Sequence, residues 1–222
     1  MKLVHSDIGT AVELKAGRPT SLTVENQRLF RELLEELLAQ SEGASGRFAL
    51  YSDCHEELPL HKSIELISQF VPFSLNRKSL LSAVMAKLEK EALSAEHWEK
   101  TQALLAEISS FVDALAMALP CDVVCEKNHL QGLLRSVGVS IAEDGVGTLE
   151  RLFDYMELVR ELLGERVFVL VNFREYFTKE ETALFFQSAA SHQFTLLLLE
   201  SRCHARVFEE ERLVIDEDLC EI

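Results

Sequence analysis

The stretch RVFVLVNFREYFTKEE, residues 166–181, carries the strongest indication of the fold. Its apolar run, Val167–Val171, has the length of a strand and no polar alternation, which is typical of a strand covered on both faces. A second run, FTLLLL at 194–199, follows a helical pattern at 178–192 that opens with a capping box, Thr178 and Glu181. Two buried strands joined by a helix form a βαβ unit, so we expect a parallel sheet.

The residue that follows the first apolar run is Asn172. In nucleotide hydrolases a strand of this kind commonly ends in an acidic residue that handles magnesium, and an amide supplies no carboxylate. No GK[ST] sequence is present, and the nearest glycine-rich segment, GASGR at 43–47, has Arg47 where a phosphate-binding loop has lysine. We therefore interpret Asn172 as a polar strand-end residue, 43–47 as a turn, and the chain as a scaffold without hydrolase chemistry.

Hydrophobic periodicity places helices and strands along the rest of the chain. Ser94 is the expected N-cap of the second long helix, and Gly43 and Gly164 are expected helix stops. The predicted helices cover 26–40, 77–93, 94–119, 129–138, 148–164 and 178–192, and the predicted strands 2–8, 11–15, 20–25, 47–53, 139–143, 167–172, 194–201 and 212–216.

Between residues 61 and 130 the sequence shows no convincing strand, and two long helical patterns there have a short connection. Such a pair is typical of an αα-hairpin inserted into a larger domain. We therefore predict an α/β head formed by 1–60 and 131–222, and a helical leg formed by 61–130.

Composition and charge limit the classes of protein that fit this chain. Its 222 residues include 22 basic and 37 acidic side chains, so the formal net charge is −15 and nucleic-acid binding requires basic residues gathered on one face. No apolar run approaches the ~20 residues of a membrane helix, and residues 1–10 lack a signal peptide's apolar region. With five cysteines and no secretion signal, we expect reduced thiols and a cytoplasmic location, with no membrane partner.

The segment CDVVCEKNH, residues 121–129, suggests a metal site. Cys121, Cys125 and His129 recur every four residues and would share one face of a helix, where they could bind zinc. A fourth ligand is missing and two valines weaken the helix, so the alternative is that the cysteines are small buried hydrophobic residues. A second cluster, residues 53–56, is interpreted as solvent-facing because adjacent loop residues seldom converge on one substrate.

The order of elements and several local patterns resemble the Csn-two family of type II-A CRISPR adaptation proteins. The resemblance covers nearly all of the chain, and its specificity comes from the ensemble of loose patterns in the expected order. They are SLTVENQRLF (21–30), FALYSD (48–53), SIELISQFVPFSLNRKSLLSAVMAKLEKEAL (63–93), LLRSVGVSI (133–141), VFVLVNFREYFTKEE (167–181) and FTLLLLESR (194–202).

This resemblance implies a P-loop-NTPase-like head without a functional P-loop, and an inserted helical leg. It implies a non-enzymatic homotetrameric ring that binds the ends of double-stranded DNA, uses calcium, and supports spacer acquisition together with the CRISPR integrase and effector nuclease proteins. Asp122 and Glu126 match the positions of the family's calcium ligands, whereas Gly132 stands where the family often has glutamate. Because calcium takes six to eight oxygen ligands, the set in this chain looks depleted.

The resemblance also implies that basic residues of the inner ring wall contact phosphates without reading bases. The candidates, the first two of which match the family by position, are Arg202, Arg135, Arg206, Arg174, Lys179, Arg77 and Lys78. Two alternative functions stay open: a nucleotide-dependent switch or hydrolase on the same fold, and a zinc-dependent protein-interaction module around Cys121, Cys125 and His129.

Overall fold

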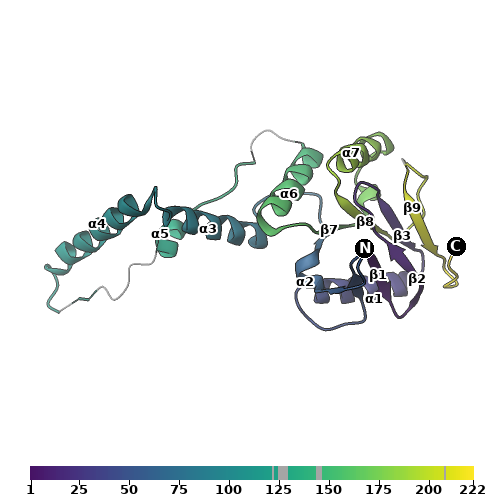
Figure 1. Ribbon diagram of the computed structural model, residues 1–222, viewed down its shortest axis with the longest axis horizontal. Coiled ribbons are helices and arrows are strands. Elements are labelled where there is room, and N and C mark those ends of the chain that lie inside the picture. Colours follow the sequence, from purple (N-terminus) through teal and green to yellow (C-terminus); the bar gives the residue numbers. More distant parts are fainter. Residues whose placement is uncertain (122, 125–129, 144–146, 208) are drawn as a thin grey trace. The chain divides into compact units, whose positions relative to one another are not determined.

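The chain divides into two compact units in the computed structural model, which describes residues 1–121, 123–124, 130–143, 147–207 and 209–222 (Figure 1). The first, here called the α/β unit, comprises Met1–Phe73 and Val146–Ile222. The second, here called the helical unit, comprises Ser74–Gly145.

A five-stranded parallel sheet forms the centre of the α/β unit, in the order β6-β7-β8-β3-β9. The predicted βαβ unit is confirmed, because β7 and β8 are parallel neighbours and α7 (Lys179–Ser191) connects them in the sequence. The strands are β3 (Thr20–Val24), β6 (Ile64–Ile67), β7 (Val167–Val171), β8 (Thr195–Glu200) and β9 (Glu211–Ile215).

A smaller antiparallel sheet is built from the first fifty-eight residues, in the order β2-β1-β4-β5. Its strands are β1 (Lys2–His5), β2 (Ile8–Glu13), β4 (Ala49–Tyr51) and β5 (Glu57–Leu58). The short helix α2 (Leu60–Ser63) then leads directly into β6 of the parallel sheet.

One face of the parallel sheet packs against α1 (Gln27–Ser41). Alternate strand residues such as Val169 and Leu197 join Leu33 and Leu37 of α1 in one buried cluster, as the two-residue period of a strand requires. Both helix residues belong to the apolar stripe of the predicted helix at 26–40, which is confirmed.

The opposite face is covered by α6 (Thr148–Leu163) and by aromatic residues around α7. Phe168 of β7 meets Phe194 edge-to-face at 5.5 Å between ring centroids. The hydroxyl of Tyr155 on α6 donates to Glu65 of β6, and Arg166 pairs with the same carboxylate at 3.1 Å. These two partners compensate the burial of a charged residue within the sheet.

Helix ends in the α/β unit follow the local signals of the sequence. Gly164 ends α6 with a φ of 89°, and Gly43 follows α1 with a φ of 101°. Thr178 Oγ1 accepts from Glu181 N, and Glu181 Oε2 accepts from Thr178 N, so the predicted capping box is confirmed.

Three local predictions are wrong. Residues 64–67 form strand β6 of the parallel sheet, so they belong to the α/β unit. The helical unit begins at Ser74, whereas the predicted leg begins at residue 61. The strand predicted at 139–143 is not formed, because the side-chain amide of Asn76 bonds both the N–H and the carbonyl of Ile141, where a neighbouring strand would pair. Ser94 is not an N-cap, since α4 begins at Trp98.

The helical unit contains α3 (Lys78–Ala92), α4 (Trp98–Ala116) and α5 (Leu130–Ser136). Within the described part of this unit, only Leu75 and Leu80 are buried hydrophobic residues, and the one buried residue of α4 is Thr101. Glu143 Oε1 accepts hydrogen bonds from the backbone N–H groups of Leu75 and Asn76, so the first and last described residues of the unit are joined. Among the described residues of both units, no helix is long and apolar enough to cross a membrane.

Candidate nucleic-acid interface

Asn172 ties the carboxyl end of β7 to that of its neighbour β8. Its backbone is in the left-handed region with a φ of 50°, a conformation that asparagine tolerates better than most residues. Its N–H donates to Leu199 O at 2.9 Å, and its Oδ1 accepts from Ser201 N at 2.8 Å. The interpretation of Asn172 as a polar strand-end residue is confirmed.

The connection between β3 and α1 lies where a phosphate-binding loop would join a strand to a helix. It consists of two residues, Glu25 and Asn26, and contains no glycine. Asn26 Oδ1 accepts from Leu29 N at 3.0 Å, so a side chain occupies the start of the helix where a phosphate would need free N–H groups. This geometry supplies no cradle for a nucleotide phosphate.

The glycine-rich segment 43–47 forms a turn after α1, as predicted. Arg47 pairs with Glu36 at 2.8 Å and with Asp7 at 2.6 Å. The Arg47 guanidinium lowers the pKa of Glu36 to about 2, against the opposing effect of partial burial. Because Arg47 is held by two carboxylates of its own unit, we assign it a structural role.

Arg174 belongs to a buried charge network, which makes it the least accessible of the DNA-contact candidates in the α/β unit. Its side chain is 4% exposed; the guanidinium pairs with Glu210, and Nε lies 4.0 Å from Glu200. Burial raises the pKa of Glu200 to about 7, although the charge of Arg174 opposes this shift. Arg174 also lines a cavity of about 180 Å³, but its guanidinium is already paired within this network.

Sequence reasoning missed most of this network. Besides Arg174, its members are Glu200, Glu210, Arg212 and His204, with burial also lowering the pKa of His204. The available signal was Glu200 itself, a carboxylate at the end of the uninterrupted apolar run LLLL. A charge inside a doubly covered strand requires a buried cation, and Arg174 follows the neighbouring strand.

Three other candidates of the α/β unit are exposed. Arg202 follows β8 with its side chain 75% exposed and its Nε 3.8 Å from Glu175. Arg206 lies four residues further along the same segment. Lys179, the first residue of α7, lines a cavity of about 180 Å³ together with His204 and Ala205 of that segment. These cations surround the carboxyl ends of β7 and β8, the edge at which open α/β sheets generally bind ligands.

In the helical unit, the structure brings Lys78 and Arg135 into one groove of about 440 Å³ between α3 and α5. None of the described residues that line this groove is acidic; they are Asn76, Lys78, Leu81, Ser82, Met85, Gln131, Arg135, Gly138 and Val139. The neighbouring candidate Arg77 is half-buried at the N-cap of α3. The groove therefore combines two cations with polar groups that can donate hydrogen bonds to phosphate.

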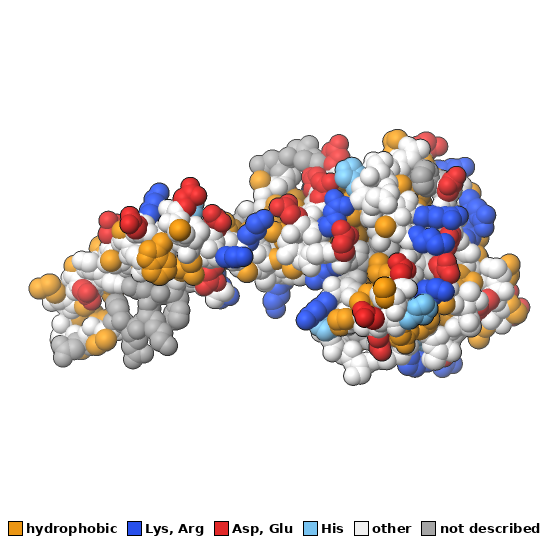
Figure 2. All heavy atoms as spheres, in the orientation of Figure 1, with side chains coloured by type: hydrophobic (Ala, Val, Ile, Leu, Met, Phe, Trp, Pro, Cys, Tyr) orange, Lys and Arg blue, Asp and Glu red, His pale blue; other side chains and the backbone are white. Residues whose placement is uncertain are grey.

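Lys and Arg side chains lie among Asp and Glu side chains on the face of the molecule drawn in Figure 2. Because positive and negative side chains are interspersed there, that face has no uniformly basic area. A groove whose described lining contains no carboxylate is therefore more informative than the position of any single exposed cation.

The predicted metal ligands Asp122 and Glu126 lie outside the described residues, as do Cys125 and His129. Gly132 is exposed on α5. Cys121 is also exposed, so its interpretation as a buried small hydrophobic residue is wrong. The residues 53–56 are exposed as predicted.

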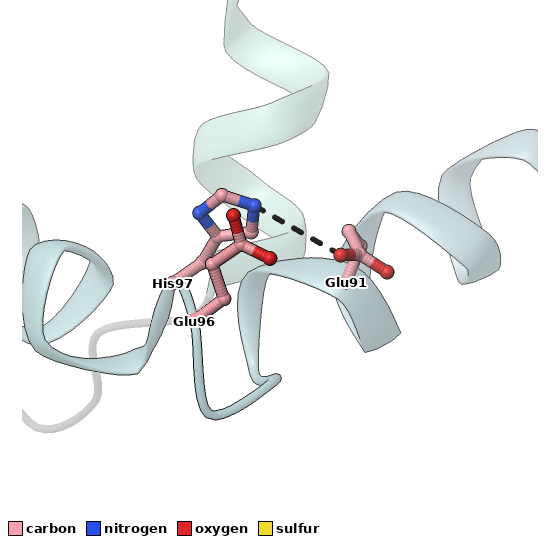
Figure 3. Close-up of side chains that lie close together, drawn as sticks. All are labelled: Glu91, Glu96 and His97. Carbon is pink, nitrogen blue, oxygen red and sulfur yellow. Dashed lines mark ion pairs between the residues drawn. The ribbon is translucent and has the colours of Figure 1, made fainter.

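Within the described part of the chain, one group of three potential metal ligands comes together, at the corner between α3 and α4 (Figure 3). It comprises Glu91, Glu96 and His97, whose ligand atoms lie within 4.8 Å of one another. All three are exposed, and Glu91 lies 3.9 Å from the imidazole of His97. An imidazole nitrogen does not suit calcium, which prefers oxygen, so this corner does not match the ion that the resemblance implies.

Comparison with known proteins identifies the family. The family model described as CRISPR-associated protein (Cas_Csn2) matches residues 40–219. The chain belongs to the Cas_Csn2 family. Among its relatives is the CRISPR-associated protein Csn2 of Streptococcus agalactiae, which is 21% identical over 206 residues that cover 92% of this chain and 90% of the relative.

The fold of this Cas_Csn2 chain is also found in a solved structure. The crystal structure of Stu0660 of Streptococcus thermophilus superposes with a TM-score of 0.58 at 16% sequence identity, covering 90% of this chain and 68% of that one. At this identity the similarity extends to the fold alone. The resemblance drawn from the sequence is thereby confirmed at the level of family, and the mixed α/β fold is confirmed by the two sheets.

Proposed function

We propose that this Cas_Csn2 protein is a non-enzymatic, sequence-independent double-stranded DNA-binding protein of type II-A CRISPR adaptation. In this proposal it acts in the cytoplasm as a homotetrameric ring, receives DNA ends, and supports spacer acquisition alongside the CRISPR integrase and effector nuclease proteins. Family membership supports the CRISPR role. The observation that carries DNA binding is the groove of Lys78 and Arg135, whose described lining contains no carboxylate in a chain of net charge −15.

The nucleotide-switch alternative finds less support in the geometry. The two-residue connection between β3 and α1 has its helix start capped by Asn26, and Asn172 is engaged between two strand ends. Neither feature leaves the backbone N–H groups or the carboxylate that a magnesium nucleotide needs. We therefore propose a P-loop-like fold without nucleotide chemistry, with P-loop-like denoting the sheet and helix arrangement only.

Self-association is supported by the surface of α4. Its apolar residues Leu104, Ile108, Phe111 and Leu115 follow the helical spacing of one stripe and are all exposed. Figure 2 shows hydrophobic side chains at the surface in this part of the helical unit. Contiguous apolar surface of this kind is characteristic of interaction sites. In the ring we propose, a second copy covers the stripe.

Replacing Phe111 with aspartate should therefore break the assembly while leaving the chain folded, because the side chain is already exposed in the single chain. Light scattering at micromolar concentration, with and without calcium, measures the mass. The proposal expects the wild type to be a tetramer and the variant a smaller species. A wild type that remains a 25.1 kDa monomer in both buffers contradicts the ring.

DNA binding is tested by the salt dependence of affinity for a linear duplex. Each neutralised phosphate contributes a slope of about −0.9 to the log–log plot, so Lys78→Ala and Arg135→Ala should each make the slope shallower by about one unit and weaken all sequences alike. Lys90→Ala is a matched control, because Lys90 is also exposed on α3 but does not line the groove. If the wild type and the three variants gave equal slopes, the proposal that the groove contacts DNA would be contradicted.

Dependence on ends is tested with linear and covalently closed circular duplexes of one sequence at one salt concentration. A closed ring can load only where a duplex terminates, so the linear form should bind more tightly. Equal affinity would exclude threading. Absence of binding to both, with calcium present, would exclude the DNA function and favour an interaction module; zinc in the purified protein would then point to Cys121, Cys125 and His129.

A further inference from the structure

A cavity of about 710 Å³ lies between the start of α6 and the helix α7 in the α/β unit. Its described lining comes from three places: the segment after β6, the first turns of α6, and the residues from the end of the 3₁₀ helix (Phe173–Glu175) through α7. The volume falls in the range of sites that enclose a ligand or a few inserted side chains. Neither Asn172 nor any DNA-contact candidate lines this cavity.

The floor of the cavity is aromatic and firmly packed. Phe177 lies 4.6 Å from Phe173 and 5.8 Å from Phe70 between ring centroids, and the two latter rings are fully buried. Phe185 packs on Phe173 from α7 at 5.0 Å. Such a floor is held in place by the core beneath it and presents ring faces and edges to an occupant.

Two glutamates give the cavity its charge. Glu150 Oε2 accepts from Gly147 N at 3.0 Å, and Glu181 Oε2 accepts from Thr178 N at 2.8 Å. Neither glutamate forms an ion pair within the described part of the chain, and no described lining residue is Lys or Arg. The two helix starts contribute together about one positive charge, so the two carboxylates leave the cavity negative.

Apolar side chains continue outward from the cavity onto the surface. Val71 is 67% exposed, Tyr176 50% and Leu184 65%, and all three line the rim. A free small cation in the cavity would leave this apolar rim in water. A protein segment would cover it, and the negative charge would repel a phosphate backbone.

We propose that this cavity docks a protein partner that inserts an arginine or lysine flanked by apolar residues. The stem and flanking residues contact Phe153, Phe177 and the rim, while the cationic group lies between Glu150 and Glu181 over aromatic faces. The proposal goes beyond DNA binding and does not depend on it, because the described lining of this cavity shares no residue with the described lining of the groove of Lys78 and Arg135.

An unbiased test is selection of random short peptides displayed on phage against the full-length protein. Counter-selection on the Leu184→Asp protein removes peptides that bind elsewhere. The proposal expects the surviving peptides to share an arginine or lysine with apolar neighbours. It is overturned if no peptide survives the counter-selection, or if the survivors share an acidic or uncharged pattern.

Charge recognition is then measured by fluorescence polarisation with a selected peptide and with its counterpart that has norleucine in place of the cation. Glu150→Gln and Glu181→Gln keep the helix-capping hydrogen bond, because glutamine serves in the same position. Each substitution should lower the affinity for the cationic peptide about five-fold and leave the affinity for the norleucine peptide unchanged. Equal losses for both peptides would show that charge plays no part, and would overturn the proposal.

Leu38→Asp is the control for Leu184→Asp, because Leu38 is an exposed leucine on α1, away from the cavity. Leu184→Asp should lower the affinity for both peptides by about ten-fold or more, whereas Leu38→Asp should leave both affinities unchanged. Circular dichroism verifies that both variants are folded. Equal effects of the two variants would contradict docking at this cavity.

Discussion

The α/β unit and the helical unit differ in where they place their apolar side chains. In the α/β unit both faces of the parallel sheet are covered, and aromatic residues such as Phe168 and Phe173 are fully buried. In the helical unit α4 exposes an apolar stripe, with Phe111 64% exposed, and its only buried residue in the described chain is Thr101. The first unit therefore contains its own core, whereas the described part of the second leaves an apolar stripe exposed to solvent.

Replacing one phenylalanine in each unit tests this difference between the units. Phe173→Ala should lower the free energy of unfolding by about 3–5 kcal/mol, because it leaves a cavity among Phe70, Phe177 and Phe185. Phe111→Ala should cost less than about 1 kcal/mol in the isolated chain. Urea denaturation at several protein concentrations measures both.

The concentration dependence separates the two units further. Phe173→Ala should lower the free energy of unfolding by the same amount at all protein concentrations. Phe111→Ala should lower it only at concentrations at which the assembly forms. A large, concentration-independent cost for Phe111→Ala would mean that α4 has an internal core after all.

Buried charge in the α/β unit predicts a dependence of stability on pH. The pKa of Glu200 is raised from 4.5 to about 7 by burial, so the folded state retains a proton that the unfolded state releases. The free energy of unfolding should therefore fall as the pH rises from about 4.5 to about 7, by on the order of 2–3 kcal/mol. Glu200→Gln should remove this slope in urea titrations across that range.

Glu36 provides the contrasting control. Its pKa is lowered to about 2, chiefly by Arg47, so its contribution is present above pH 4.5 and is lost as the pH falls towards 2. Glu36→Gln should leave the slope between about pH 4.5 and 7 unchanged. If it removed the same slope, the assignment to Glu200 would be wrong.

Asn172 tests how much one strand-end side chain contributes to the α/β unit. Asn172→Ala should lower the free energy of unfolding by about 2 kcal/mol, since it loses the hydrogen bond to Ser201 N and puts alanine, which tolerates the left-handed region less well than asparagine, at a φ of 50°. Asn172→Gly removes only the hydrogen bond and should cost about half as much. Equal costs would mean that backbone conformation contributes nothing.

The smallest expected effect lies in the helical unit. Glu143→Ala removes the acceptor for Leu75 N and Asn76 N, so hydrogen exchange at these two amides should become about ten-fold faster. Glu96→Ala, an exposed residue of the same unit, is the control and should leave both rates unchanged. Unaltered exchange in Glu143→Ala would show that other contacts hold this segment.

The predictions that succeeded rest on local signals. The apolar runs of β7 and β8, the capping box of Thr178 and Glu181, and the glycine stop at Gly164 are each contained in a few neighbouring residues. The family resemblance succeeded because many such weak signals occur in the right order.

The predictions that failed depend on partners distant in the sequence. Strand β6 is four residues long and contains Glu65, whose partners Tyr155 and Arg166 lie about a hundred residues away. The local sequence around Arg174 indicates a surface cation, because only the fold brings Glu210 beside it. For the candidate site, the sequence supplied Lys78 and Arg135 as separate residues, and only the packing of α5 against α3 joins them in one groove.

The hydrogen bonds of Glu143 have a consequence for how this chain could be altered. By holding Leu75 and Asn76 next to its own position, Glu143 closes the intervening residues into a loop whose two ends are fixed together. The entropy cost of closing a loop changes slowly with its length, so the α/β unit is insulated from insertions or deletions inside it. We therefore expect that a short turn or a foreign helical hairpin can replace residues 77–140 without altering the register of the parallel sheet.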